Sequence, residues 1–326
     1  MTQSAGARSP EMREHSEGWT DQSRQTLKTD SLLLFAAIIW GFAFVAQRLG
    51  MQYVGPFGFN GVRFALGCLV LLPLLLRNGR GGQDGSSRPA GFFSLPSPAG
   101  GLLAGLVLFA GASFQQVALV YTTAGNAGFI TGLYVVLVPI LGIALGHRTH
   151  AGVWIGTTLA AAGLYLLSVT DRFTLSPGDL LVLIGAFIWA CHVHIIGWLS
   201  PRQDPLRIAF LQCGACAVLS LIVSAVIEQN TPRRYLSAAI PILYGGILSV
   251  GVAYTLQVVG QKRAKPAHAA IILSLEAVFA AIGGWLILGE ILTPRAVMGC
   301  ALMLCGMLVS QLWRMPSKDA AIPGAA

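Results

Sequence analysis

Long apolar runs separated by short polar links dominate the chain. Each run is close to the ~20 residues that a helix needs to cross ~30 Å of hydrocarbon. The runs are continuous, whereas the strands of a membrane barrel alternate apolar and polar residues, so helices are favoured over a barrel. The pattern predicts ten membrane-spanning helices, over residues 31–49, 57–76, 98–120, 124–146, 151–170, 179–199, 206–227, 238–260, 267–289 and 295–313.

Composition points to the same class of protein. Of the 326 residues, 55% are hydrophobic and 10% are charged, and the mean hydropathy is +0.69. A soluble domain carries ~25% charged residues, so the sequence predicts an all-α integral membrane protein in contact with the lipid bilayer. The net charge of +8 is spread between the apolar runs, and we expect no nucleic-acid partner. The six cysteines lie within apolar runs and indicate no disulfide framework.

The two ends of the chain and one long link are polar. Residues 1–30 carry charges of both signs and lack the apolar core of a signal peptide, which predicts a disordered tail. Residues 314–326 form a second tail, and residues 77–97, rich in Gly, Ser and Pro, are expected to form a surface loop. Most Lys and Arg residues fall on the side of the N-terminus, so we expect both termini in the cytoplasm of a multi-pass inner (plasma) membrane protein.

The chain also contains an internal repeat. Residues 145–168 match residues 288–311 at a constant offset. The coinciding pairs include Gly156 with Gly299, Gly163 with Gly306 and, at slightly different offsets, Trp40 with Trp189 and Gln116 with Gln257. Each half, residues 31–170 and 179–313, holds five predicted spans, and an odd number makes the second half enter the membrane from the opposite side. Two inverted five-helix repeats are typical of secondary transporters, with the substrate site near the midplane where the halves meet.

Several stretches resemble the drug/metabolite transporter superfamily, EamA type. They are ALVYTTAGNAGFITGLYVVLVPILG, GQKRAKPAHAAIILSLEAVFAAIGGWLILGEILTPRAVMGCALMLCG, and the shorter IIWGFAFVAQR and FNGVRFALG. The resemblance covers essentially residues 31–313. It implies a ten-helix inner-membrane carrier, often an exporter of amino acids or other small metabolites, that works by alternating access, and it implies no single substrate.

The chain departs from the pattern of this family at two places. The Gly-Glu that commonly closes the fourth helix is Gly146-His147 here, which weakens a catalytic role for the closing Glu of the second half. Ala277 follows Glu276 where the family often has Pro. The second departure predicts a less kinked ninth helix.

The apolar run over residues 266–290 carries two carboxylates, Glu276 near its middle and Glu290 at its end. A carboxylate in hydrocarbon is costly, so Glu276 indicates a polar path through the bundle. Two interpretations stay open: a structural carboxylate, protonated or paired with Arg63, or a site for a proton or a substrate ammonium group. The repeat aligns Glu290 with His147 at a helix end, so we interpret Glu290 as structural. Arg63 is expected to bond helix ends or brace a carboxylate rather than bind substrate.

Histidines and tryptophans supply further candidates. His192 and His194 are two positions apart on a helix, so their side chains point in different directions and we expect no shared metal ion. His192 either exchanges protons with Glu276 or is a hydrogen-bonded packing residue. Trp40 and Trp189 approach the midplane from opposite sides, and we expect them to line a cavity rather than face lipid.

Neutral polar residues within or beside the spans can form hydrogen bonds without a permanent charge, either to a substrate or between helices. These residues are Tyr134, Tyr254, Gln116, Gln257 and Asn126. Cys213 and Cys216 share a helical face and are interpreted as packing residues, because no further cysteine pair or histidine follows at metal-ligand spacing. The link that holds His147, Arg148 and His150 is expected to be solvated. The sequence predicts no metal site and no cofactor.

The leading functional interpretation is a secondary carrier for a small metabolite such as an amino acid, driven by proton exchange or by simple facilitated export. The sequence has no GxxxxGK[ST] phosphate loop, so we expect that this chain alone does not use ATP. The alternative is a membrane-embedded lipid or prenyl transferase, which needs clustered acids or a nucleophile with a base, whereas Glu276 stands alone in the spans. A channel or sensor would need a ring of charges or an appended soluble domain. We therefore expect a transporter that is not an enzyme.

Overall fold

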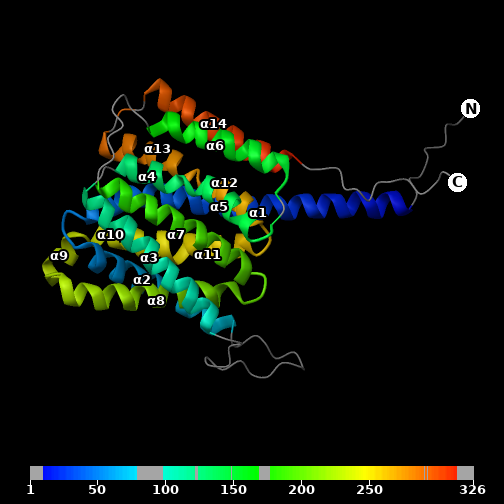
Figure 1. Ribbon diagram of the computed structural model, residues 1–326. Coiled ribbons are helices and arrows are strands. Elements are labelled where there is room, and N and C mark those ends of the chain that lie inside the picture. The colour runs from blue at the N-terminus through cyan, green and yellow to red at the C-terminus, as the bar shows by residue number, and fades with distance from the viewer. Residues whose placement is uncertain are drawn as a thin grey trace, which may run out of the picture.

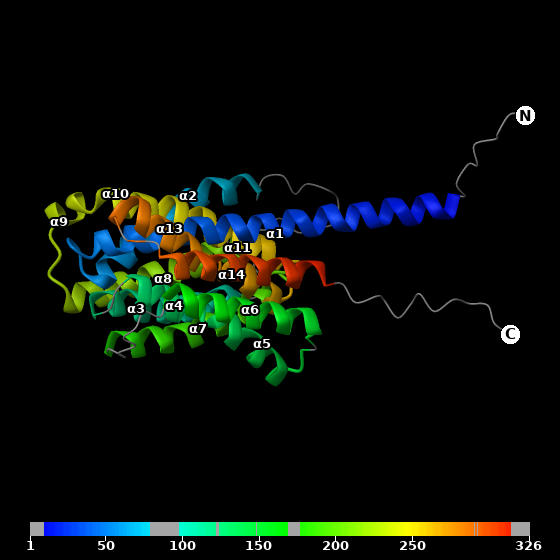
Figure 2. The same cartoon turned by 90° about the horizontal axis from the view of Figure 1, so that it is seen from above.

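Helices form all the regular structure in the part of the chain that the structure, a computed structural model, describes. That part comprises residues 10–78, 98–121, 124–147, 149–168, 177–289, 291 and 293–313. The helices lie along one another in one elongated bundle (Figures 1 and 2). They are α1 (Pro10–Gly50), α2 (Pro56–Asn78), α3 (Ala99–Tyr121), α4 (Ala124–Gly132), α5 (Tyr134–Ala144), α6 (Ala151–Ser168), α7 (Pro177–Leu199), α8 (Pro205–Ile227), α9 (Pro232–Ser237), α10 (Ala239–Leu243), η1 (Tyr244–Ala253), α11 (Tyr254–Gln261), α12 (Pro266–Leu273), α13 (Glu276–Leu288) and α14 (Pro294–Leu312).

Seven of these helical stretches are long and apolar enough to cross a membrane, judged by length and composition among the described residues. They are Arg24–Gly50, Pro56–Arg77, Ala99–Tyr121, Pro177–Leu199, Pro205–Ile227, Ala239–Gln261 and Pro266–Leu288. Three shorter apolar helices, Ile130–Ala144, Ala151–Leu166 and Pro294–Ser310, lie where the sequence predicts further spans. The count of ten spans stays a prediction.

The first helix is longer than the sequence predicts. α1 begins at Pro10 and projects beyond the bundle (Figures 1 and 2), so the prediction of a disordered tail over residues 1–30 is wrong from residue 10 onward. Pro suits the first position of a helix, and the Glu, Arg, Gln and Lys residues that follow lose little rotamer freedom in one. Residues 1–9 and the second predicted tail, 314–326, lie outside the described residues.

Two of the predicted spans are interrupted near their middles. The helix predicted over 124–146 is divided into α4 and α5 at Leu133, and the helix predicted over 267–289 is divided into α12 and α13 at Ser274 and Leu275. At both places the backbone tightens to bonds between residues three apart, such as Leu133 N to Ile130 O (3.2 Å) and Leu275 N to Ile272 O (3.2 Å). The two breaks fall at matching positions of the predicted repeat.

The expectation of a less kinked ninth helix stays a prediction, although the α-helix is interrupted at Ser274 and Leu275. The helix breaks without a proline, and the Ser274 hydroxyl donates a hydrogen bond of 2.8 Å to Ile271 O. A serine hydroxyl that bonds a carbonyl of the preceding turn offers the backbone an alternative to the helical ladder and often bends a helix.

The span predicted over 238–260 also changes along its length, because its middle section, η1, is a ten-residue π-helix. Two hydrogen bonds tie η1 to α1: Trp40 Nε1 donates to Ser249 O (3.1 Å), and the Tyr244 hydroxyl donates to Ile39 O (2.9 Å). Wide helical turns of this kind are frequent at functional sites. Ser249 of η1 lines a small cavity together with Trp40 and Glu276.

Packing within the bundle follows a crosswise pattern. α1 packs on α13, η1 and α11, while α7 packs on α4, α5 and α3; α2 packs on α8 and η1, and α3 packs on α8. α6 and α14 run side by side along one face (Figure 1). They cross at glycines: an added Cβ would lie 2.7 Å from Gly306 O at Gly156 and 2.5 Å from Gly299 O at Gly163. Small residues at a crossing allow membrane helices to pack this closely.

Candidate functional site

A small cavity lies in the middle of the bundle, next to both helix breaks. We name it the central cavity; its volume is about 50 Å³, room for a few water molecules and far below the ~300–1,000 Å³ of a typical ligand pocket. Thr131 and Tyr134 lie beside the break in the first half, and Leu273 and Glu276 beside the break in the second. The full lining is Trp40, Gln47, Arg63, Gln115, Thr131, Tyr134, Trp189, Val193, Ser249, Tyr254, Gln257, Leu273 and Glu276.

Most of the residues selected from the sequence line this cavity, but not all. Gln116 and His192 are fully buried and are absent from its lining. His192 Nε2 forms a 2.9 Å hydrogen bond with Gln212 Oε1, and its ring lies 5.7 Å from that of Trp189. The geometry fits the packing interpretation of His192, which supports the aromatic wall from behind. The side chain of Asn126 and the whole of Glu290 lie outside the described residues.

Three aromatic rings form one wall of the central cavity. The ring centroids of Trp40 and Tyr254 are 4.8 Å apart with an interplanar angle of 60°, and Trp189 stacks on Tyr254 at 6.5 Å. Both indole N–H groups are engaged, Trp40 with Ser249 O and Trp189 with Gln115 Oε1 (3.0 Å). With their donors satisfied, the rings offer π faces, which attract cations and apolar groups.

A chain of amides that sequence reasoning missed holds this wall in place. Gln115 accepts from Trp189 and donates through Nε2 to Gln47 Oε1 (3.3 Å), and Gln47 Nε2 donates to Ala43 O (3.2 Å). The repeat selected Gln116, but adjacent residues on a helix point about 100° apart, and it is Gln115 that faces the cavity. The two consecutive glutamines, Gln115 and Gln116, within a predicted span were the sequence feature that could have indicated this amide chain.

Glu276 is the carboxylate of the central cavity. It is the first residue of α13, is 6% exposed, and has the side chain of Tyr134 as its hydrogen-bond partner. An acid at the N-terminus of a helix is stabilised by the helix dipole. The cavity thus joins the start of one half-helix, α13, to the start of another, α5, through Glu276 and Tyr134.

Arg63 is the cation of the same cavity. It is 4% exposed, its Nε donates to Asn60 Oδ1 (3.0 Å), and its guanidinium lies 5.0 Å from the ring centroid of Phe64. No ion pair joins it to Glu276, although the structure describes both residues. The structure therefore does not pair Glu276 with Arg63, and two buried ionisable groups line one cavity without an ion pair between them.

A second, larger cavity opens at the end of the bundle from which α1 projects. We name it the end cavity; its volume is about 690 Å³. Its lining includes four histidines, His147, His150, His194 and His268, together with Arg263, Lys265 and Asp30. The link holding His147 and His150 therefore borders a cavity, which the sequence analysis did not foresee. His194 points away from His192, and its Nε2 bonds Val138 O at 2.8 Å.

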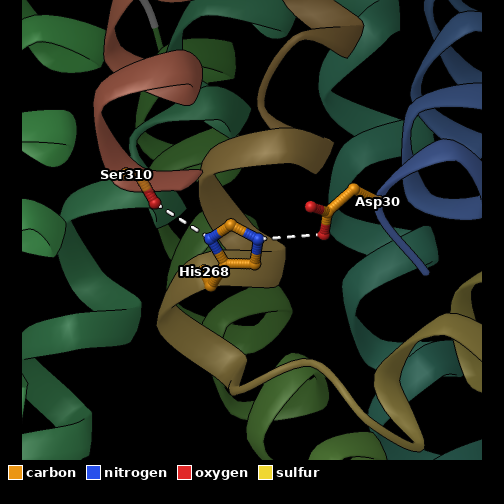
Figure 3. A network of polar contacts seen from close by, with 3 residues as sticks. All are labelled: Asp30, His268 and Ser310. Carbon is orange, nitrogen blue, oxygen red and sulfur yellow. Dashed lines mark hydrogen bonds and ion pairs between the residues drawn. The ribbon is translucent and has the colours of Figure 1, made fainter. Parts of the chain in front are cut away.

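One polar network fixes the inner edge of the end cavity (Figure 3). His268 of α12 bonds Asp30 Oδ1 of α1 through Nε2 (3.0 Å) and Ser310 Oγ of α14 through Nδ1 (2.9 Å). The network ties residue 30 to residue 310, so the first apolar turn of α1 and the last turns of α14 lie at the same end of the bundle. Sequence reasoning missed His268, although it lies in the same predicted span as Glu276.

Packed apolar residues separate the two cavities. Along α5, Tyr134 lines the central cavity and Gly142 the end cavity, with the buried Val135 and Val138 between them. Along α12, Leu273 lines the central cavity and His268 the end cavity, and residues 269–272 between them are all buried. A layer of buried residues on α5 and α12 therefore lies between the two cavities.

Comparison with known proteins agrees with this architecture. The EamA-like transporter family matches two stretches of the chain, residues 27–169 and 176–311. An uncharacterized transporter of Archaeoglobus fulgidus is 34% identical over 295 residues, which are 88% of this chain and 86% of that protein. The uncharacterized inner membrane transporter YedA of Escherichia coli K12 is 28% identical over 234 residues, 70% of each chain. A solved structure, described as a crystal structure of a protein, has the same fold, with a TM-score of 0.69 at 21% identity over 86% of this chain and 96% of the other. This multi-pass membrane protein belongs to the EamA-like transporter family.

Proposed function

We propose that this transporter exports small zwitterionic metabolites, such as amino acids, across the inner membrane by alternating access between two inverted five-helix halves. The observation that carries the proposal is the pair of buried side chains in the central cavity that can carry opposite charges. Glu276 and Arg63 both line it, and neither forms an ion pair with a described residue. An ammonium group would meet Glu276, a carboxylate would meet Arg63, and the rest of the substrate would lie on the wall of Trp40, Trp189 and Tyr254.

Two inverted halves are supported by pairs of contacts that exchange under the repeat. α1 packs on α13 as α7 packs on α4. In the same way, α1 packs on η1 as α7 packs on α3, and α2 packs on η1 as α8 packs on α3. The α6–α14 crossing behaves alike: Gly156 meets Gly306 and Gly163 meets Gly299, so each glycine contacts the repeat mate of the other. A pseudo-two-fold axis produces reciprocal contacts of this kind. Interrupted helices at corresponding positions of two halves are the usual pointer to a transporter's binding site.

The closed layer between the cavities is the gate in this proposal. Val135 and Val138 of α5, with residues 269–272 of α12, would have to separate for a substrate to pass from the end cavity to the central cavity. The breaks at Leu133 and at Ser274 provide hinges at the inner ends of these two half-helices. Movement of α5 and α12 relative to α4 and α13 would open the central cavity, whose present volume has room only for water.

The end cavity faces the cytoplasm in this proposal. It lies beside the links 146–150 and 262–265, which the positive-inside rule assigns to the cytoplasm. The His268 network brings α1 and the end of α14 to this same side, which supports cytoplasmic placement of both termini. A reporter enzyme active only in the cytoplasm, fused after residue 326, should be active; activity only in a periplasmic reporter would contradict the orientation.

Glu276 also offers a route for proton coupling. A carboxylate that binds the substrate ammonium in one conformation can release it on protonation in the other. The alternative of a lipid or prenyl transferase receives no support from this site, because Glu276 is the one carboxylate in the lining of the central cavity. The transferase chemistry would need further acids or a nucleophile with a base.

The test is counterflow in proteoliposomes that contain the purified full chain. Vesicles loaded with an unlabelled amino acid are diluted into the same amino acid in labelled form, across a panel of neutral amino acids. For each active compound, its decarboxylated amine and its N-acetylated acid are compared. We expect counterflow of the zwitterion but of neither derivative. Vesicles without protein should show no counterflow of any compound. Equal movement of the amine would contradict the role of Arg63, and no movement of any panel member would contradict the substrate class.

A further inference from the structure

The end cavity differs from the central cavity in charge and size, and the transport proposal does not account for its lining. We propose that it is a binding site for a small molecule bearing a phosphate or carboxylate group. The inference goes beyond the proposed function and stands without it, because it concerns other residues and equilibrium binding rather than flux.

The balance of charges in the lining favours an anion. Arg263 and Lys265, both from the link between α11 and α12, contribute two permanent positive charges, and Asp30 contributes the one carboxylate. Asp30 is 7% exposed and is already engaged by His268 at 3.0 Å. The cations therefore lack a counter-charge of their own within the described lining, and a surface of one sign attracts ions of the other.

The pKa of His150 is affected by positive charges of the same lining. Burial lowers the pKa of the His150 imidazole, and the charges of Lys265 and His268 lower that pKa further. His150, Lys265 and His268 all line the end cavity. An anion between His150 and Lys265 would relieve the repulsion and offer both a partner.

His194, which lines the same cavity, has an unpartnered ring nitrogen among the described residues. Its side chain is 8% exposed and lines the end cavity. Nε2 bonds the carbonyl of Val138, which can only accept, so Nε2 carries a proton. Nδ1 has no hydrogen-bond partner among the described residues, and neither has Nδ1 of His150. Buried ring nitrogens without partners are uncommon, and protonation of Nδ1 would turn either ring into a donor for a bound anion.

The start of α12 adds backbone donors. The helix begins at Pro266, and its N-cap residue, Lys265, makes no side-chain cap bond. Ala267 and His268, in its first turn, belong to the cavity lining. The first turn of a helix is an established place for phosphate and carboxylate groups, because free N–H groups and the helix dipole both favour negative charge. A volume of about 690 Å³ is within the ~300–1,000 Å³ of ligand pockets.

The test is anion-dependent thermal stabilisation of the full chain purified in a neutral detergent. Inorganic phosphate and succinate are titrated against chloride at constant ionic strength, and Tm is recorded. The variant is Arg263→Gln/Lys265→Gln, and the matched control is Lys262→Gln, an exposed residue of the same link that does not line the cavity. We expect a saturable rise in Tm for wild type and control, and an apparent affinity at least about tenfold weaker in the double variant. Lys265→Gln alone should weaken binding by a smaller factor.

Two further outcomes decide the inference and the source of the ligand. Equal stabilisation of wild type and both cavity variants, or no stabilisation of wild type by either anion, would overturn it. In nanodiscs, stabilisation by phosphate that persists in phosphatidylcholine identifies a soluble anion. Stabilisation found only with phosphatidylglycerol, and lost in the double variant, identifies a lipid headgroup as the source of the same chemistry. These measurements do not use transport activity. If no anion binds to the end cavity, the transport proposal is unaffected and is still tested by counterflow.

Discussion

The central cavity and the end cavity are lined by different kinds of side chain. The central cavity is lined by partly buried or buried aromatic rings, by amides, and by one acid and one base, and it has room for only a few waters. The end cavity has histidines and exposed cations and is large enough for a ligand. The first is built where half-helices begin in the middle of the bundle, and the second where helices begin at its end.

The difference indicates two kinds of recognition in one molecule. A buried charge held by fixed neighbours, such as Glu276 beside Tyr134, selects a ligand strongly because an unmatched charge is costly there. Exposed cations such as Arg263 and Lys265 are screened by salt and select by sign rather than by shape. Substitutions in the central cavity should therefore change transport by large factors, and substitutions at the end cavity should act mainly on binding of anions and on stability.

The largest effect is expected for Glu276→Gln. The change keeps the shape of the side chain and the hydrogen bond with Tyr134 but removes the charge. Interactions with a charged group contribute ~1.5–3 kcal/mol each, so substrate affinity should fall by about 10- to 100-fold, and any dependence of flux on a pH gradient should disappear. Counterflow and Tm are measured together, with Asp204→Asn, an exposed N-cap change, as the control. A variant with normal flux and unchanged pH dependence would remove Glu276 from the mechanism.

A smaller but selective effect is expected for Arg63→Gln. Loss of the guanidinium should raise the KM of the zwitterion about tenfold and bring it close to that of the decarboxylated amine, because the carboxylate no longer has a partner. Arg63→Lys keeps the charge without the planar fork and should lie between wild type and Gln. If all three proteins discriminate between the zwitterion and its amine equally well, Arg63 only braces the helices, as the sequence had suggested.

The helical class and most of the central cavity could be predicted from the sequence, because both follow from strong local costs. A Glu or Arg within an apolar run must lie near other polar groups. Trp40 and Trp189 occupy matching positions of the predicted repeat. The breaks in the fourth and ninth predicted helices were not foreseen, because Ser274 breaks its helix through a hydroxyl bond and no proline marks the position. The choice between Gln115 and Gln116 depends on helix rotation within the bundle, which tertiary packing sets.

The end cavity could not be predicted for a related reason. Its residues come from α1, the α5–α6 link, α7 and the start of α12, which are distant in sequence and carry no shared motif. Each of His147, His150 and His268 resembles an ordinary residue at the border of a span. The helical start of α1, which the polar composition of residues 10–30 concealed, brings Asp30 into contact with His268.

At the end cavity we expect His268→Ala to affect stability more than transport. The variant loses contacts to both Asp30 and Ser310, which together should cost about 1–2 kcal/mol, while Ser310→Ala loses one contact and should cost about half as much. Chemical denaturation or Tm would give the order wild type, Ser310→Ala, His268→Ala, with little change in the KM of a zwitterion. A KM change as large as that of Arg63→Gln would mean that the two cavities are not separate in function.

The smallest effect is expected for His150→Gln, and it depends on pH. Burial first, then the charges of Lys265 and His268, lower the pKa of His150 in the folded protein. The unfolded chain therefore binds the proton more readily, so the folded state loses stability as the pH falls through the ordinary histidine pKa of ~6.5. Between about pH 7.5 and pH 5.5 the Tm of wild type and of Lys262→Gln should fall further than that of His150→Gln, which cannot be protonated. Phosphate bound beside His150 would favour its charged form and reduce this difference, whereas a gap between wild type and His150→Gln that phosphate leaves unchanged would separate His150 from the anion.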